Sequence, residues 1–247
     1  MRGFWNLTLM QFKLFLRDPI GTFFTLAFPP MMVLLFGAMY GNDPSPYFNG
    51  YGSMDVSMPA YTGMILGTVG FLGIPISLSA MREIGVLRRY RASALRPVTF
   101  IFADVLNNLL MTLLGMLLLL IVGSLLYQVK FEGDPLSVAG AVILCALSMF
   151  SIGYVIASIS PTARTAQVVG MVIFYPMLFL SGAGMPLEIL PDSIRTISTF
   201  LPLTYAVNLL KGLWFGGVWG DYLLDTAILV GILGVCTLVA SRFLQWE

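Results

Sequence analysis

The sequence of 247 residues contains no histidine and few charges, with 10% charged against 58% hydrophobic residues. Soluble domains carry about 25% charged residues, so this composition, with a mean hydropathy of +0.90, indicates an integral membrane protein. The lack of histidine removes the commonest metal ligand and proton shuttle. Cys145 and Cys236 lie inside apolar runs, so we expect buried packing residues rather than a disulfide or a metal site.

Motifs of several function classes are also missing. None of the three lysines, Lys13, Lys130 and Lys211, follows the glycine run of a phosphate-binding loop, so this chain is expected to bind no ATP by that motif, and no metal. A membrane-embedded enzyme acting on lipid would need a nucleophile or metal cluster, and none is found. A secondary carrier would need a titratable group at mid-membrane. Asp104 is the one candidate, and we interpret it as interfacial because it lies within two turns of the start of its span.

The most basic stretch of the chain is 81–97. It contains one acid, Glu83, and five arginines, Arg82, Arg88, Arg89, Arg91 and Arg96. An arginine at the centre of the hydrocarbon layer costs at least ~2.5 kcal/mol. This stretch therefore lies in water between two spans, and basic loops stay on the cytoplasmic side.

Six apolar segments are long enough to cross a membrane, which needs about 20 residues each. They cover approximately 19–42, 57–80, 99–127, 136–159, 165–183 and 222–242. The sequence therefore predicts an all-α integral membrane protein with six transmembrane helices in a single domain, 1–247. We expect a kink at Pro29-Pro30 in the first span.

Two further segments are apolar but are not expected to span. Residues 1–18 combine basic and aromatic side chains, as in an amphipathic helix lying in the membrane interface. Residues 184–221 are interrupted by Pro186, Pro191 and Pro202 and carry Glu188, so we expect two short re-entrant helices at the outer side. Ten basic residues then lie inside and three outside, which obeys the positive-inside rule and places both termini in the cytoplasm.

Two side-chain patterns within the spans have more than one interpretation. Gly63, Gly67 and Gly70 allow close helix packing, either at a moving dimer or gate interface or within one subunit. Aromatic residues of the first and fifth spans either line a path for an apolar substrate or fill the core and face lipid. These are Phe24, Phe28, Phe36, Phe174, Tyr175 and Phe179.

Two separated motifs resemble the membrane subunits of type-2 ATP-binding-cassette (ABC) transporters. The first is Glu83-Ile84-Gly85-Val86-Leu87-Arg88-Arg89, which continues to Leu95-Arg96-Pro97. The second is Ser181-Gly182-Ala183-Gly184-Met185-Pro186-Leu187-Glu188-Ile189-Leu190-Pro191, followed by Leu201-Pro202-Leu203-Thr204-Tyr205. The resemblance covers essentially the whole chain. Arg96 departs from it, because the family often has an uncharged residue before this proline.

The resemblance implies a mechanism. Two permease subunits, as a homodimer or heterodimer, would each dock one ABC ATPase subunit, and that partner would bind ATP and Mg. Segment 82–97 would be the cytoplasmic coupling helix, with Glu83, Gly85, Arg88, Arg89 and Arg91 at the docking site. The re-entrant helices, with Pro186, Glu188, Pro191 and Pro202, would form the outer gate.

The expected cargo of such an exporter is a hydrophobic or amphipathic small molecule, and a lipid-linked polysaccharide is the alternative. We expect a bacterial or archaeal cytoplasmic membrane, contact with lipid, and no nucleic acid.

Overall fold

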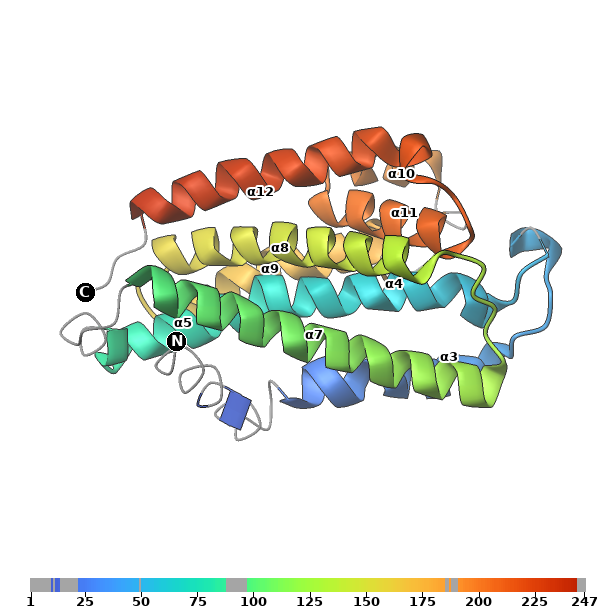
Figure 1. Cartoon of the computed structure of the whole chain (residues 1–247), viewed down its shortest axis with the longest axis horizontal. Coiled ribbons are helices and arrows are strands. Elements are labelled where there is room, and N and C mark those ends of the chain that lie inside the picture. The colour runs from blue at the N-terminus through green and yellow to red at the C-terminus, as the bar shows by residue number, and fades with distance from the viewer. Residues whose placement is uncertain are drawn as a thin grey trace.

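The computed structural model describes residues 10, 12–13, 22–48, 50–87, 97–184, 187 and 191–243. Within these residues every regular element is a helix, as the sequence predicts. The long helices lie side by side along the longest axis of the molecule (Figure 1). The expected interfacial helix, 1–18, falls outside the described residues apart from Met10, Phe12 and Lys13.

The helices follow one another along the chain with short connections. Their bounds are η1 Phe23–Ala27, α3 Phe28–Tyr40, η2 Pro46–Phe48, α4 Ser53–Thr68, η3 Val69–Gly73, α5 Ile74–Glu83, α7 Pro97–Tyr127, α8 Pro135–Ile159, α9 Ala163–Leu180, α10 Asp192–Ser198, α11 Pro202–Trp214, η5 Trp219–Tyr222 and α12 Leu223–Phe243. Among the described residues, five continuous helices are long and apolar enough to cross a membrane: Ser53–Glu83, Thr99–Tyr127, Pro135–Ile159, Ala163–Leu180 and Trp219–Phe243. The first expected span corresponds to a shorter apolar helix, Thr25–Tyr40.

The π-helical turns η1 and η3 stand directly before prolines. η1 precedes Pro29-Pro30 and η3 precedes Pro75. A proline has no backbone N–H, so a carbonyl about one turn earlier in the helix has no hydrogen-bond donor. A local π-helical turn accommodates this missing hydrogen bond. The irregularity expected at Pro29-Pro30 therefore takes the form of a π-helical turn.

Glycines on neighbouring helices make room for these two turns. A Cβ atom at Gly115 of α7 would lie 2.7 Å from the carbonyl oxygen of Thr25, and one at Gly153 of α8 would overlap that of Gly70. The absence of side chains lets each neighbouring helix approach the π-helical backbone directly. The distorted parts of the two proline-containing helices are therefore packed inside the bundle.

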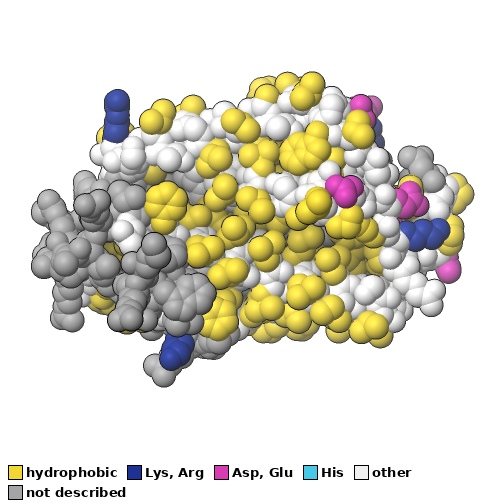
Figure 2. Space-filling view, in the orientation of Figure 1, with side chains coloured by type: hydrophobic (Ala, Val, Ile, Leu, Met, Phe, Trp, Pro, Cys, Tyr) yellow, Lys and Arg dark blue, Asp and Glu magenta, His cyan; other side chains and the backbone are white. Residues whose placement is uncertain are grey.

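The bundle has two chemically different ends. We call the end where α5 finishes and α9 begins the basic end, with Arg82, Glu83, the turn 160–164 and Arg242. The opposite end, with segments 41–52, 128–134 and 214–222, is the loop end. Figure 2 shows apolar side chains across the middle of the visible face and charged side chains toward its two ends. On α12, Val235 and Leu238 are exposed, as expected of a surface that faces lipid.

The second expected span is longer than the sequence predicted. It runs without a break from Ser53 to Glu83, so Asp55, which precedes the expected span 57–80, lies in the first turn of α4 and is buried. The segment expected to hold two short helices contains α10 and α11. α11 packs against α4, α8 and α12 near the loop end, between α12 and α4 in Figure 1. Whether these helices re-enter the membrane stays a prediction.

Candidate functional site

The end of α5 is shaped by Gly85. This glycine has a φ of +71°, a left-handed conformation that favours glycine and ends a helix. Its N–H donates to the carbonyl oxygen of Arg82, 3.0 Å away, and nothing lies within 4 Å of the place a side chain would take. Gly85 therefore has a role inside this chain, in ending α5. The close approach of a partner that we expected there stays a prediction.

Arg82 and Glu83 contact the turn between α8 and α9. The Arg82 guanidinium donates a hydrogen bond to the backbone carbonyl of Ser160. The Glu83 carboxylate accepts one from the backbone N–H of Ala163, with 3.2 Å between the atoms. Ala163 is the first residue of α9, and the Thr162 side chain caps the same helix by accepting from the N–H of Thr165 at 3.1 Å. The two charged residues thus hold the turn. The sequence predicted a contact of Glu83 with a partner protein and none for Arg82.

The other expected coupling residues, Arg88, Arg89 and Arg91, lie outside the described residues. The same holds for Pro186 and Glu188 of the expected outer gate. Its remaining members are found at helix starts, where proline is favoured: Pro191 is the N-cap of α10, and Pro202 begins α11. The docking and gate roles stay predictions.

The glycine pattern of the second span faces the interior of the same chain. Cβ atoms at Gly63 and Gly67 would lie 2.7 Å from the Val207 side chain and 2.5 Å from that of Phe174, on α11 and α9. One at Gly70 would lie 2.7 Å from the carbonyl oxygen of Met149 on α8. Of the two interpretations, packing within one subunit describes these contacts.

The expected aromatic path residues contact two different parts of the long helix Ser53–Glu83. Phe36 of α3 packs on Tyr61 of α4, with ring centroids 6.4 Å apart. Phe174 of α9 packs on Phe71 of η3, with centroids 6.1 Å apart. The remaining set differs in exposure: Phe28 is partly buried, Tyr175 and Phe179 are exposed, and the Phe24 side chain is outside the described residues. A substrate role for this set stays a prediction.

Asp104, which was expected at the membrane interface, is buried inside the bundle. Its residue is 7% exposed, and its carboxylate accepts a hydrogen bond from the Tyr154 hydroxyl of α8 at 2.6 Å. One turn later on the same face of α7, Asn107 is also buried. The distance of Asp104 from the helix end gives its depth along the bundle, and the burial shows that it lies on the side of α7 that faces α8. Its position at the membrane interface stays a prediction.

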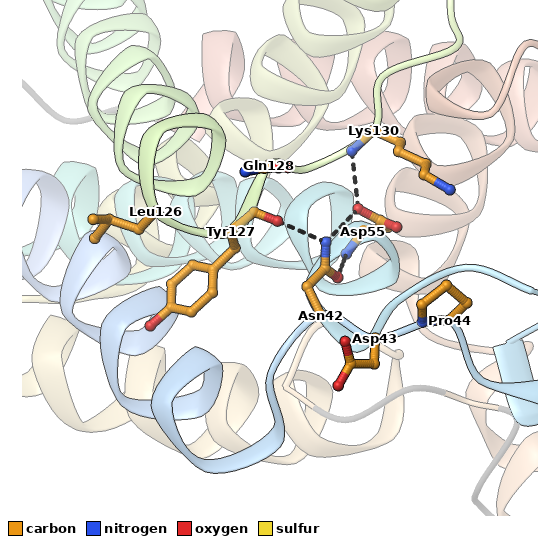
Figure 3. Close-up of a pocket in the computed structure, with 8 residues that line it drawn as sticks. All are labelled: Asn42, Asp43, Pro44, Asp55, Leu126, Tyr127, Gln128 and Lys130. Carbon is orange, nitrogen blue, oxygen red and sulfur yellow. Dashed lines mark hydrogen bonds between the residues drawn. The ribbon is translucent and has the colours of Figure 1, made fainter.

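A hydrogen-bonded network closes the loop end (Figure 3). Gly52, the N-cap of α4, has no side chain that could accept a hydrogen bond from the helix. The Asn42 side-chain oxygen does so instead, and it accepts from the N–H groups of Met54 and Asp55 at 3.0 and 3.1 Å. The Asn42 amide group donates to the Asp55 carboxylate and to the carbonyl of Tyr127, both at 3.0 Å. One side chain thus joins the segment after α3, the start of α4 and the end of α7.

Asp55 completes this network and is 1% exposed. Besides Asn42, its carboxylate accepts from the N–H of Lys130 and the N–H of Gly52, each at 2.9 Å. A buried carboxylate needs such donors, since an unpaired one would cost several kcal/mol. The residues of the network border a cavity of about 340 Å³ with Asp43, Pro44, Leu126 and Gln128. The hydrogen bonds of Asn42 and Asp55 to other segments of the chain indicate that this network is a structural junction.

A second set of contacts extends this junction to α11. The Tyr51 hydroxyl donates to the Glu132 carboxylate at 2.8 Å, and this bond raises the pKa of Tyr51. The indole N–H of Trp214 donates to the carbonyl of Lys130 at 3.1 Å. Asp134 caps α8 by accepting from Ser137, whose hydrogen bonds lower the pKa of Asp134. The loop end therefore ties several helices together.

The described part of the chain offers no group of three or more acidic, cysteine or histidine side chains that could hold a metal ion. Cys145 and Cys236 are both free thiols, the first buried and the second partly buried. Buried cysteines behave as small apolar residues, so these two contribute packing.

Comparison with known proteins covers nearly the whole chain. The family model described as ABC-2 type transporter matches residues 2–215. ABC transporter G family member 20 of Dictyostelium discoideum is 24% identical over 211 residues, 83% of this chain and 28% of that protein. Inner membrane transport permease YhhJ of Escherichia coli (strain K12) is 28% identical over 187 residues, 69% of this chain and 49% of that protein.

A third relative has a more similar length. Daunorubicin resistance ABC transporter permease protein DrrB1 of Streptomyces coeruleorubidus is 25% identical over 224 residues, 88% of this chain and 75% of that protein. Against the first two relatives, the chain spans less than half of the other protein's length. The family match, together with several apolar helices of spanning length, identifies a multi-pass membrane protein: the chain belongs to the ABC-2 type transporter family.

Proposed function

We propose that this chain is the membrane-spanning permease subunit of an ATP-driven exporter. The observation that carries the proposal is the family match over residues 2–215, which includes the basic stretch and the second motif. Two copies, or one copy and a related chain, would form the pathway. Two separate ATPase subunits would bind ATP and Mg and drive it.

We place the docking of the ATPase on segment 82–97 at the basic end, which would face the cytoplasm together with both termini. Arg88, Arg89 and Arg91 would meet the partner, with Glu83 and Gly85 at the start of the segment. The distribution of basic residues supports this orientation. A rigid pair of flanking helices, α5 and α7, suits an element that passes on a rigid-body shift.

We place the cargo among hydrophobic or amphipathic small molecules. Two relatives support that class by their names, the daunorubicin resistance permease DrrB1 and the probable multidrug ABC transporter permease YbhR of Escherichia coli. A lipid-linked polysaccharide is the second candidate on the resemblance alone.

The proposal is tested by purification of the full chain from its host membrane. An ATPase subunit should co-purify, and daunorubicin, used as a probe, should change its rate of ATP hydrolysis. The chain freed of that subunit should hydrolyse no ATP, because it lacks the phosphate-binding loop. Hydrolysis by the pure chain, or the absence of any ATPase partner, would refute the proposal.

Orientation is tested separately by labelling single cysteines in intact cells. A cysteine at Asp43 in the loop end should react with a membrane-impermeant reagent from outside, and one at Arg164 in the basic end should not. The opposite pattern would invert the assignment of the two ends.

A further inference from the structure

The contacts of Arg82 and Glu83 join two loops that are distant in the sequence. The Glu83 carboxylate accepts from the first N–H of α9, 80 residues away, and Arg82 donates to the carbonyl of Ser160, at the start of the turn and 78 residues away. The first N–H groups of a helix lack partners within it, and a negative charge is favourable there. The turn is therefore held at both of its sides by adjacent residues of α5.

These two residues occupy a special position along the chain. Gly85 ends α5 two residues after Glu83. Arg82 and Glu83 are therefore the last charged groups of this helix, at the start of segment 82–97, to which we assign docking. Glu83 is exposed and Arg82 partly exposed. An exposed contact of this kind contributes little to stability. It can still link the two segments, so that a displacement of one is passed to the other.

α9 is placed to receive such a movement. It packs against α5, and a Cβ atom at its Gly170 would overlap the carbonyl oxygen of Phe71 in η3. A shift of the turn would be carried along α9, whose 18 residues span about 27 Å. The far end of α9 leads toward α10 and α11 at the loop end (Figure 1).

We propose that Arg82 and Glu83 are positioning residues that clamp the α8–α9 turn to the end of α5, so that α9 moves with the coupling segment. This inference rests on the proposed function, and it assigns Glu83 a partner inside the chain. Docking through the negative charge of Glu83 is the competing role. The two roles separate because the clamp needs a hydrogen-bond acceptor at position 83, whereas charge-based docking needs an anion.

The contact itself is tested in the purified full chain without any partner. Cysteines at positions 83 and 163, in a background with Cys145→Ala and Cys236→Ala, should be joined by a short bis-maleimide. A matched pair at positions 83 and 167, one turn further along α9, should react less. Because a cysteine at position 83 lacks the carboxylate, the pairs test whether the end of α5 lies beside the start of α9. Equal yields would contradict that proximity, on which the clamp depends, whatever becomes of the proposed transport function.

The coupling role is tested in the complex with its ATPase subunit. Nitroxide labels at Gln167 of α9 and Ser241 of α12, both exposed, should change their separation when vanadate traps the nucleotide. Glu83→Gln keeps an acceptor oxygen and should keep this change. Glu83→Ala should lose it even when the ATPase is added at a concentration that saturates the complex. Arg164→Gln, which removes a neighbouring exposed charge outside the clamp, is the matched control and should behave as the parent protein does.

Three results would overturn the inference. One is a full distance change in Glu83→Ala with the ATPase bound. Another is a loss of ATPase binding of about tenfold or more in both Glu83→Gln and Glu83→Ala, which assigns the charge to docking. The third is a parent complex in which α9 does not move. Failure to obtain any complex refutes the proposed function instead, and the cross-linking result still decides the contact.

Discussion

Two helices begin under a cap that another part of the chain supplies, and the two caps differ in chemistry. At the loop end the neutral side chain of Asn42, itself partly exposed, caps α4 within a network centred on the buried Asp55. At the basic end the charged side chain of Glu83 meets the start of α9 while remaining exposed. A buried network is costly to open, because each freed polar group loses its partner without gaining water. An exposed charged contact exchanges readily with water.

The difference suggests a division of labour along the bundle. The loop end holds α3, α4, α7 and the segment before α8 in fixed relation, whereas the basic end joins α5 to the α8–α9 turn by contacts that can break and reform. Substitutions at the loop end should therefore reduce stability. Those at the basic end should change coupling with little effect on stability.

The largest effect is expected for Asp55→Ala. It removes an acceptor that serves Asn42, Lys130 and Gly52 in a buried position, and it should lower the free energy of unfolding by on the order of 3 kcal/mol. The measurement is denaturant unfolding in mixed micelles. Asp43→Ala, an exposed acid beside the same cavity, should change little. Equal losses in both variants would show that the network does not stabilise the loop end.

A smaller loss of stability is expected when one glycine at each end, Gly133 or Gly85, is replaced by alanine. A side chain at Gly133 would overlap the carbonyl oxygen of Leu213, so Gly133→Ala should cost about 2 kcal/mol by forcing the backbones apart. Gly85→Ala meets open space and suffers only from its positive φ, about 1 kcal/mol. Melting temperatures of the two variants give the order. A larger loss at Gly85 would reverse the comparison.

Tyr154→Phe tests whether the buried contacts near the basic end, unlike its exposed ones, contribute to stability. It removes the hydroxyl that donates to the buried Asp104 and should cost about 2 kcal/mol, because a buried acceptor loses its donor. Tyr175→Phe, at an exposed side chain on α9, is the control. If Tyr154→Phe leaves the unfolding midpoint unchanged, the polar pair contributes nothing to stability and a functional role for Asp104 gains weight.

The helices could be predicted from the sequence because long apolar runs, and the prolines and glycines at their ends, are local signals. The 99–127 and 136–159 segments match α7 and α8 within two residues at each end. The resemblance to the transporter family was confirmed by the family match. Apolarity also explains the error at Ser53–Asp55, where the helix begins among polar residues that the protein buries.

The contacts between segments could not be predicted in the same way. Nothing in the sequence around Asn42 shows that its side chain caps a helix beginning at Ser53 and reaches Tyr127, 85 residues away. The partnership of Glu83 with Ala163 has the same character, since it depends on α5 and α9 lying side by side. The burial of Asp104 against α8 was also missed, because packing determines which side of α7 faces α8, and a helix that is apolar all round gives no signal of that side.

The smallest effect concerns pH and is confined to the loop end. The hydroxyl and the N–H of Ser137 lower the pKa of Asp134, so the contribution of this cap is present above the unfolded value of about 3.9 and is lost as the pH falls through the lower folded value. The hydrogen bond to Glu132 raises the pKa of Tyr51, so its contribution is present below about 10 and is lost as the pH rises through the higher folded value. Both side chains are in contact with water, so the changes in stability should be small.

Protease cleavage within 41–52 and 128–134 should therefore be constant at neutral pH and rise slightly at both extremes. Asp134→Asn should abolish only the acidic rise and Tyr51→Phe only the alkaline one; a rise of equal size in the 160–164 turn would show that the two ends do not differ in this respect.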